Sequence, residues 1–253
     1  MRALAIISAA GVIAVVAGIV RRRHRVRRAR STYPDVVLTY YDMPGKADAI
    51  RFALAFGVPF IDRRLTMAEA DAEREAGRLD PFGQLPMLHI CGNDGIAQSD
   101  AVLRLAARLA GNELVPSDPV LAARADQWVS AESDFSYPFL IALFPERCYL
   151  PAWRSEDAAS YHLQLLTQHI PRFLRVLEEA LAESPTGWLA HTAGPSIADL
   201  CWAPRLQWLE SGCLDWLPCS ILHPYPLTHS LIARVHNLPE VAAWRQEAES
   251  VRS

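Results

Sequence analysis

The sequence predicts an α/β domain followed by an all-helical domain, with a single hydrophobic helix in front of them. Residues 36–111 alternate strand-like apolar runs with helix-like periodicity, whereas nearly all of the chain after residue 119 has helical periodicity. Residues 3–20 are uncharged and almost wholly apolar. With 253 residues, 51% of them hydrophobic, the chain can form one or two domains with full-sized cores.

The N-terminal segment predicts a membrane anchor. The apolar run of residues 3–20 is followed by an arginine-rich run, residues 21–30, and massed arginines are typical of the cytosolic side of a membrane-spanning helix. We therefore expect residues 1–34 to form an anchor and a linker, with the globular part facing the cytosol. Organelle targeting is the alternative, because this segment contains many arginines and no acid.

The rest of the chain is acidic. The net charge of the whole chain is −3, and residues 1–30 contribute eight arginines and no acid, so subtracting them leaves about −11. An acidic globular body argues against nucleic acid as a partner. The five cysteines form no CxxC pair and are expected to be reduced thiols. The eight histidines form no cluster, so no metal site is predicted.

The first domain, residues 35–112, is expected to follow a β-α-β-α-β-β-α order. Strands are predicted at residues 36–40, 58–65, 87–90 and 96–97, and helices at 47–56 and from Ser99 onward, with a charged, helical or irregular segment at 67–78. The residue types suggest Ser99 as the N-cap of the last helix and Gly111 as its left-handed C-cap.

The second domain, residues 119–253, is expected to be all-helical. One helix is predicted over residues 120–144, where Pro138 could break it, and another over residues 156–183, where Pro171 could kink it. A capping-box pattern then begins a further helix, and two short helices follow a loop rich in proline and histidine.

The chemically interesting point is the start of the helix at Ser99. A helix N-terminus carries partial positive charge and free N–H donors, so it favours a carboxylate or a phosphate, and Gln98 and Ser99 add side-chain groups beside those donors. If the Leu85–Pro86 bond is cis, the backbone of Leu85 faces outward and can pair with an extended peptide. Taken alone, the same pattern is typical of an ordinary capped helix after a hairpin.

Three sequence blocks together resemble one known family. They are VLTYYDMPGKADAIRFALAFGVPF, PFGQLPML with GIAQSDAVLRLAARLAG, and GPSIADLCWAPRLQWLESG. In this order, and over residues 35–245, they resemble the cytosolic glutathione S-transferases, closest to the sigma-like classes that use a tyrosine. The resemblance implies a thioredoxin-like first domain, a helical glutathione transferase domain, a homodimer, and glutathione as the co-substrate with no further cofactor.

The resemblance implies that Tyr40 is the catalytic residue. Conjugation requires a thiolate, and an unperturbed thiol has a pKa of about 8.5, which a hydroxyl donor aimed at the sulfur lowers. Tyr40 lies at the C-terminal end of the first strand, where α/β domains commonly place their sites. Lys46, the only lysine in the chain, falls where sigma-like members carry an arginine near the sulfur, and its ammonium could help to hold the thiolate.

The rest of the glutathione site is also implied by the resemblance. The peptide would pair with the backbone of Leu85, the γ-glutamyl carboxylate would lie at Gln98 and Ser99, and Gln84 would lie near the glycyl end. Asp134 would reach the γ-glutamyl amine across the dimer interface. The expected glutathione-binding residues are therefore Tyr40, Lys46, Gln84, Leu85, Pro86, Gln98, Ser99 and Asp134.

Some family positions are not matched. The Trp and Lys that hold the glycyl carboxylate would fall within residues 73–77, and neither is present, which leaves Arg74 or Arg78 as replacements. Ser133 stands where sigma-type prostaglandin D synthases have a second acid, and their pocket tryptophan has no match, which argues against that specificity. The pocket for the electrophile is expected near Met43, Tyr137, Leu140 and Phe144.

The predicted function is conjugation of the glutathione thiolate to small hydrophobic electrophiles by a membrane-anchored homodimer, with Tyr40 stabilising the thiolate. A glutathione-dependent isomerase or peroxidase at the same site is one alternative. A non-catalytic scaffold or binding protein that keeps the fold is another. The missing glycyl contacts favour the scaffold, whereas the retained Tyr40, Gln98 and Ser99 oppose it.

Overall fold

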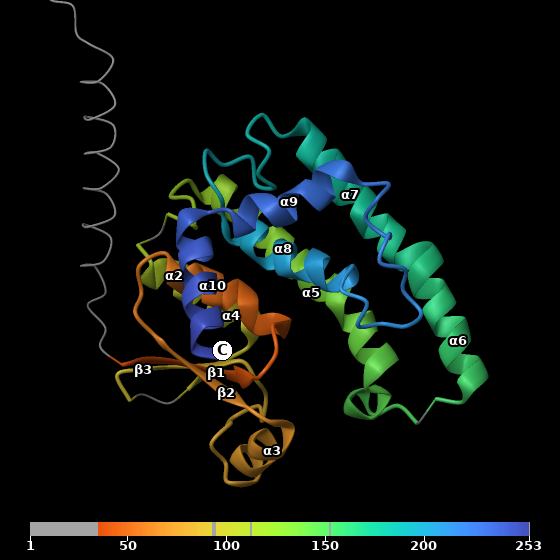
Figure 1. The fold of residues 1–253 in the computed structure, drawn as a ribbon, viewed down its shortest axis with the longest axis horizontal. Coiled ribbons are helices and arrows are strands. Elements are labelled where there is room, and N and C mark those ends of the chain that lie inside the picture. Colours follow the sequence, from red (N-terminus) through yellow and green to blue (C-terminus); the bar gives the residue numbers. More distant parts are fainter. Residues whose placement is uncertain (1–34, 93–94, 112, 152, 253) are drawn as a thin grey trace, which may run out of the picture.

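The computed structural model describes residues 35–92, 95–111, 113–151 and 153–252. Figure 1 shows a small sheet flanked by helices next to a larger bundle of long helices. We refer to residues 35–111 as the α/β part and to residues 113–252 as the helical part. The mixed sheet and the predominance of helix agree with the class of fold expected from the sequence.

A four-stranded mixed sheet organises the α/β part, with the strand order β2-β1-β3-β4. Its strands are β1 (Val36–Tyr41), β2 (Ile61–Leu65), β3 (Met87–Ile90) and β4 (Ile96–Ala97). β1 pairs in parallel with β2 and antiparallel with β3, which pairs antiparallel with β4. Val36, Leu38 and Tyr40 alternate along β1 and are all buried, so one side of this central strand faces the core.

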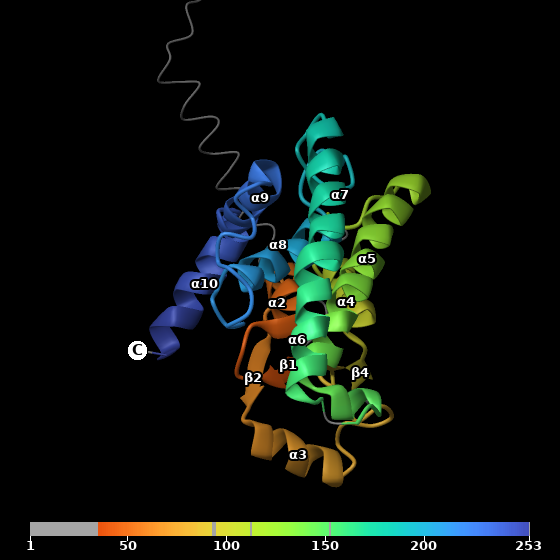
Figure 2. The same cartoon turned by 90° about the vertical axis from the view of Figure 1, so that its right-hand side faces the viewer.

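Helices cover the sheet. A short 3-10 turn, η1 (Gly45–Ala47), leads from β1 into α2 (Asp48–Ala55), which packs beside α4 (Ser99–Leu109). α3 (Met67–Glu75) lies on the opposite side of the sheet from α2 and α4, as Figures 1 and 2 show. Thr66 caps α3, because its hydroxyl accepts from the N–H of Glu69 while the Glu69 carboxylate accepts from the N–H of Thr66.

The helical part surrounds one buried helix. Its helices are α5 (Pro119–Leu143), α6 (Ser155–Gln164), α7 (Ile170–Glu183), α8 (Ile197–Leu209), α9 (Pro226–His236) and α10 (Pro239–Arg252), with a 3-10 turn η2 (Pro145–Cys148). α8 packs against α2, α5 and α9 and is buried over most of its length. It therefore joins the two parts, and its contact with α2 brings its side chains near the end of the central strand β1.

Several local predictions are confirmed and others are corrected. Ser196 and Asp199 form the expected capping box, with Ser196 N–H donating to Asp199 Oδ2 at 2.8 Å. α5 continues through Pro138 without a break. The helix predicted over residues 156–183 is instead interrupted by a π-helical turn, η3 (Leu165–His169), immediately before the helix that contains Pro171.

Two element starts differ from the prediction. The second strand begins at Ile61 and not at residue 58, consistent with Pro59 lacking the N–H that a paired strand donates. The N-cap of α4 is Gln98, whose φ of 74° is left-handed, and Ser99 is the first helical residue. The prediction of Ser99 as the N-cap is therefore wrong by one position.

The predicted membrane anchor is corrected. Within the described ranges, no helix is long and apolar enough to cross a membrane, and the longest of them, α5, carries acidic and basic side chains along its length. Residues 3–20, on which the prediction was based, lie outside the described residues. The membrane-anchored location, with the globular part facing the cytosol, is therefore not carried further.

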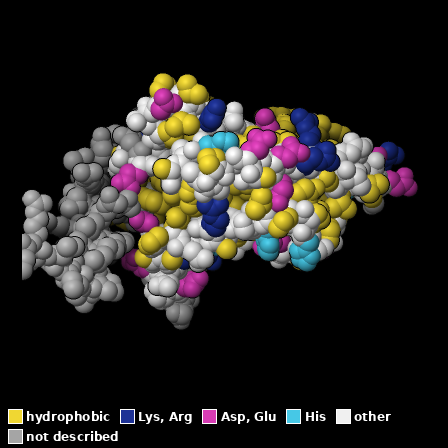
Figure 3. Space-filling view, turned by 90° about the horizontal axis from the view of Figure 1, so that it is seen from above, with side chains coloured by type: hydrophobic (Ala, Val, Ile, Leu, Met, Phe, Trp, Pro, Cys, Tyr) yellow, Lys and Arg dark blue, Asp and Glu magenta, His cyan; other side chains and the backbone are white. Residues whose placement is uncertain are grey.

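The surface seen from above carries mixed side chains. Figure 3 shows acidic, basic and histidine side chains interspersed among hydrophobic ones over the helices on that face.

Candidate active site

Tyr40 ends the buried side of β1 with its hydroxyl directed at the turn that follows the strand. The residue is 8% exposed, and the N–H of Lys46 donates to Tyr40 Oη at 3.2 Å. Gly45 has a φ of 48°, and a Cβ added there would overlap the Tyr40 hydroxyl. Glycine is therefore required at this position for two reasons, its left-handed backbone conformation and the close approach of the tyrosine.

Burial raises the pKa of the Tyr40 hydroxyl above its ordinary value of 10.0. The hydrogen bond from Lys46 N–H and the positive charges of Arg205 and Arg51 act in the opposite direction but do not outweigh burial. The hydroxyl is therefore neutral near pH 7. Because its oxygen already accepts from Lys46, its own proton is free to be donated to a ligand in front of it.

Arg51 holds the loop after β1, and sequence reasoning missed it. This fully buried guanidinium donates from Nη1 to the carbonyl oxygens of Met43 at 2.9 Å and Pro44 at 3.3 Å. It also pairs with Asp48 at 2.8 Å and with Asp62 at 3.1 Å. The signal was an arginine inside an otherwise apolar helix, where a charge needs partners from several elements.

The predicted peptide-binding residues lie together at the same end of the sheet as Tyr40, because the register pairs Met87 with Thr39 of β1 and with Ala97 of β4. Gln98 Nε2 donates to Gln84 Oε1 at 3.1 Å, and both side chains are exposed. Leu85–Pro86 is a cis peptide bond, with Leu85 half-buried in front of β3. Ser99 is half-buried at the first position of α4, so its hydroxyl and the free N–H groups of the helix start lie next to Gln98.

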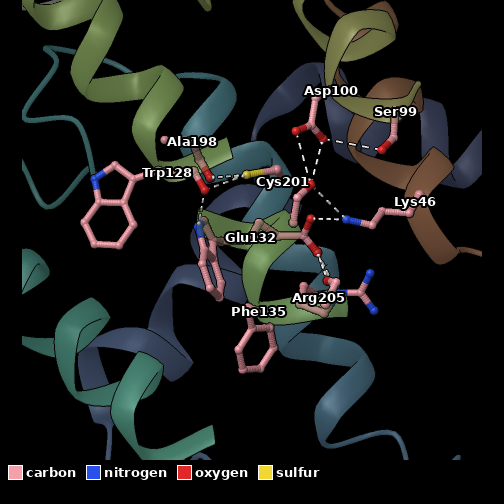
Figure 4. Close-up of polar contacts among 12 residues, drawn as sticks. Lys46, Ser99, Asp100, Trp128, Glu132, Phe135, Ala198, Cys201 and Arg205 are labelled. Atoms are coloured by element: carbon pink, nitrogen blue, oxygen red, sulfur yellow. Dashed lines mark hydrogen bonds and ion pairs between the residues drawn. The ribbon is translucent and has the colours of Figure 1, made fainter. Parts of the chain in front are cut away.

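The side chain of Lys46 turns toward the helical part and meets a buried carboxylate. Its Nζ lies 2.5 Å from Glu132 Oε2 and 3.4 Å from the hydroxyl of Ser133. The other oxygen of Glu132 accepts from Arg205 Nε at 2.7 Å and from the hydroxyl of Ser136 at 2.5 Å. Figure 4 shows this carboxylate between the two cations.

Glu132 is 4% exposed and yet ionised. Burial alone would raise its pKa, but the charges of Arg205 and Lys46, with hydrogen bonds from Lys46 and Ser136, outweigh burial and hold the pKa at about 2. Three elements thus meet through one charge: the η1 turn, α5 and α8.

A second acid, Asp100, lies above the Glu132 carboxylate in Figure 4, next to Ser99. Its carboxylate accepts from the Ser133 hydroxyl at 3.0 Å and 3.1 Å, and the Ser99 hydroxyl donates to it at 3.4 Å. Ser133 therefore bridges the start of α4 to the Lys46–Glu132 pair.

These groups surround a small recess between the two parts. Lys46, Ser99, Glu132 and Arg205 line it, together with Cys201. Burial raises the pKa of the Cys201 thiol well above its ordinary value, and Cys201 Sγ donates to the carbonyl of Ala198 at 3.1 Å. Cys201 therefore supplies no thiolate to the recess.

Other predicted residues lie outside the recess. Asp134 is exposed on α5, and Tyr137, 56% exposed, follows it toward the end of that helix. The remaining residues of the predicted electrophile pocket, Met43, Leu140 and Phe144, are also exposed and do not line the recess.

The two candidate replacements for the glycyl contacts differ. Arg74 Nε donates to the carbonyl of Gly83 at 2.8 Å, next to Gln84, and Arg74 Nη2 donates to the Tyr41 hydroxyl at 3.3 Å. Arg78 is instead paired with Glu73 at 2.9 Å. Arg74 is therefore the one that lies at the peptide-binding loop.

Sequence reasoning also missed Glu132 and Arg205. The buried positions of α5 include Trp128, Val129, Phe135 and Phe139, and Glu132 falls in the same helical stripe. An acid in an apolar stripe was the available signal. In the described part of the chain, no group of three His, Cys, Asp or Glu side chains could hold a metal ion.

The chain is similar to glutathione S-transferases over most of its length. Residues 148–248 match the family model "Glutathione S-transferase, C-terminal domain". The chain is 30% identical over 218 residues to hematopoietic prostaglandin D synthase of Gallus gallus, covering 85% of this chain and 96% of that protein. It is 29% identical to glutathione S-transferase 1 of Ascaris suum, covering 85% of this chain and 97% of that protein.

Solved structures share the fold. Prostaglandin synthase D of Nilaparvata lugens aligns with a TM-score of 0.71 at 23% identity, over 84% of this chain and 98% of that chain. A rat hPGDS complexed with a quinoline aligns with a TM-score of 0.67 at 25% identity, over 85% and 97% of the two chains.

Proposed function

We propose a specific reaction for this chain, which belongs to the glutathione S-transferase family and is a glutathione transferase. It conjugates the glutathione thiolate to small hydrophobic electrophiles, and Tyr40 stabilises the thiolate. The observation that carries the proposal is the hydroxyl of Tyr40. It is neutral, it accepts from Lys46 N–H, and it keeps a proton to donate. Glutathione is the co-substrate, and the reaction needs no further cofactor.

In the proposed reaction, the thiol of bound glutathione loses its proton to solvent and the thiolate accepts a hydrogen bond from Tyr40 Oη. The thiolate attacks the electrophilic carbon, a C–S bond forms, and the bond to the leaving group breaks. Lowering the thiol pKa by about two units, from about 8.5 to below 7, requires about 3 kcal/mol of preferential stabilisation of the anion. A buried hydroxyl donor can supply much of this, because a hydrogen bond to a charged group contributes about 1.5–3 kcal/mol.

The rest of glutathione would extend along the edge of the sheet. We place the γ-glutamyl carboxylate at Gln98, Ser99 and the α4 N-terminus, and pair the peptide with the backbone of Leu85 beside Pro86. Gln84 would meet the glycyl end, with Arg74 as the cation nearest to it. Asp134, exposed on α5, would reach the γ-glutamyl amine of a second protomer, which makes the enzyme a homodimer.

The finer class assignment is part of the proposal. We place the chain among the sigma-like, tyrosine-type classes, with residues 35–112 as a thioredoxin-like domain and residues 119–253 as the helical domain. A glutathione-dependent isomerase at the same site is the second candidate, favoured by the 30% identity to a protein named hematopoietic prostaglandin D synthase. Ser133, in place of that class's second acid, argues for conjugation instead.

The test is conjugation of glutathione to chlorodinitrobenzene by the full chain and by Tyr40→Phe. We expect kcat/KM to fall at least about tenfold in the variant, a loss of about 1.4 kcal/mol of transition-state stabilisation. The ultraviolet absorbance of bound thiolate should appear at higher pH in the variant. Tyr149→Phe is the matched control, because Tyr149 is 98% exposed and lies outside the recess.

Equal activity of Tyr40→Phe and the native enzyme would remove Tyr40 from the mechanism and leave the family assignment intact. Retention on immobilised glutathione without turnover would favour a binding protein. If the native chain neither turns over chlorodinitrobenzene nor is retained on immobilised glutathione, the non-catalytic scaffold is favoured.

A further inference from the structure

Arg205 brings an open guanidinium edge into the recess. It projects from α8, its side chain is 12% exposed, and its Nε donates to Glu132 at 2.7 Å. Its guanidinium carbon lies 5.0 Å from the centre of the Trp208 ring. The backbone of α8, the carboxylate and the indole together limit how this side chain can move.

The terminal nitrogens of Arg205 have no protein partner among the described residues. Figure 4 shows them turned away from the Glu132 carboxylate. These nitrogens are not fully buried, unlike the polar side-chain atoms of the described chain that lack a partner and are closed off from solvent. Solvent or a ligand can therefore reach them. A guanidinium has five N–H donors in a planar fork, and here Nε alone is engaged by protein.

The geometry suits an anion with two oxygens. Two terminal nitrogens on one guanidinium edge match a carboxylate bidentately, and such charge-assisted pairs are among the stronger hydrogen bonds in proteins. Glu132 compensates part of the local positive charge, but it engages Arg205 through Nε and Lys46 through Nζ and leaves the terminal nitrogens of Arg205 open. Asp100 lines the same recess, and its carboxylate accepts from the hydroxyls of Ser99 and Ser133.

Arg205 is also close enough to the thiolate site to matter. Its charge acts on the Tyr40 hydroxyl, and it lines the same recess as Gly45 and Lys46. A group bound at Arg205 would therefore belong to a molecule that also presents its reactive carbon to the sulfur.

We propose that Arg205 is a specificity-determining residue that binds a carboxylate on the second substrate, so that this enzyme prefers electrophiles carrying a carboxylate to uncharged analogues of the same shape. The inference rests on the proposed conjugation function. Glu132 is the positioning residue that fixes the orientation of Arg205. The preference comes from the terminal nitrogens, because the net charge of the protein is negative and does not attract a carboxylate.

The test uses two matched aryl chlorides with the full chain. One is a chloronitrobenzoate and the other the corresponding chloronitrobenzamide, each with the nitro group ortho to chlorine and the acid or amide para to it. In both, the thiolate forms a C–S bond to the ring carbon, the C–Cl bond breaks, chloride leaves, and the thiol proton passes to solvent. Each kcat/KM is divided by the uncatalysed rate constant with glutathione, which removes the difference in intrinsic reactivity.

We expect the native enzyme to favour the carboxylate over the carboxamide by at least about tenfold, and Arg205→Gln to bring the ratio close to one. Arg205→Lys should give an intermediate ratio, because an ammonium keeps the charge but loses the fork. The ratio of two substrates on one variant cancels any loss of folded enzyme. Arg175→Gln is the control, since Arg175 is an exposed arginine of α7 outside the recess, and it should leave the ratio unchanged.

A second measurement applies if the two aryl chlorides are conjugated too slowly for kcat/KM to be determined. The benzoate and the benzamide are each used as competitive inhibitors of chlorodinitrobenzene conjugation, and the inhibition constants should show the same order and the same loss in Arg205→Gln.

Three results would overturn the inference. The native enzyme could show no preference for the carboxylate in either measurement. Arg205→Gln could leave the ratio unchanged. It could also slow both substrates equally while raising the pKa of bound glutathione, which would make Arg205 a thiolate-stabilising residue. These outcomes differ from failure of the proposed function, in which chlorodinitrobenzene itself is not conjugated and the Arg205 inference falls with it.

Discussion

The free energy of the buried charge cluster can be measured by replacing Glu132 with Gln. The substitution keeps the size of the side chain and removes its negative charge, so Lys46 and Arg205 face each other across a neutral amide. Removing one partner of a buried ion pair commonly costs about 3–5 kcal/mol, because the remaining charge stays buried without compensation. The cluster contains two cations, which favours a cost in that range.

The pKa of Glu132 gives an independent magnitude. It lies at about 2 in the folded chain against an ordinary value of 4.5. At about 1.4 kcal/mol for each pKa unit, ionisation of this side chain contributes about 3 kcal/mol to folding at neutral pH. Because the pKa is depressed by folding, this contribution is fully present above pH 4.5 and is lost as the pH falls toward 2. About a quarter of it should be lost at pH 4 and more than half at pH 3.

The assay is urea unfolding of the native chain and Glu132→Gln at pH 7, 4 and 3. All seven tryptophans follow residue 127 in the chain, so tryptophan fluorescence reports on the helical part that contains Glu132. We expect the native chain to be more stable by about 3 kcal/mol at pH 7, with the difference shrinking as the pH falls. Glu179→Gln, at an exposed position of α7, should change stability by less than about 0.5 kcal/mol. A difference below about 1 kcal/mol at pH 7, or one that does not change with pH, would refute this account of the cluster.

Two further predictions concern the Tyr40 turn and a half-buried histidine. Gly45→Ala should lower kcat/KM for chlorodinitrobenzene at least about tenfold, because the added methyl group displaces the Tyr40 hydroxyl. Gly92→Ala is the control, at a left-handed glycine with open space around it, and it should cost only about 1 kcal/mol of stability. Equal losses of activity in the two variants would contradict the steric argument. Burial lowers the pKa of His236 to about 4, so the free energy of unfolding should decline as the pH falls from about 6.5 to 4, by about 1–2 kcal/mol after allowance for partial exposure. His236→Phe should remove that decline and the exposed-site control His223→Phe should not, which urea unfolding at pH 7 and 5 would decide.

The order of elements could be predicted because each rests on a local signal. The alternation of β1, the stripe of α7 and the Ser196–Asp199 capping box are short-range patterns that reappear in the structure. The errors arise where contacts with residues outside the segment determine the backbone conformation. Gln98 takes a left-handed backbone immediately before α4, and nothing in its neighbours in sequence requires that conformation.

The candidate site divides in the same way. Tyr40, Lys46, Gln98 and Ser99 could be predicted as site residues because they lie in short blocks with a family resemblance, and their roles stay predictions. Glu132 was not, because an acid is by default an exposed residue, and its cations lie 86 and 73 residues away in the chain. A buried charge is decided by partners that the fold brings together, so its role could not be inferred from its own neighbourhood in sequence.

The site lies where the two parts of the chain meet because Lys46 contacts residues of both. Its backbone N–H holds the Tyr40 hydroxyl, and its ammonium holds Glu132, which in turn orients Arg205 from α8. The donor proposed for the thiolate and the cation proposed for the second substrate therefore depend on one short turn, Gly45–Ala47. A shift of α8 against the sheet would act on both through the same residue. This predicts that thiolate stabilisation and carboxylate preference are coupled, so the effects of Tyr40 and Arg205 substitutions should not simply add, as expected for residues that share a partner network.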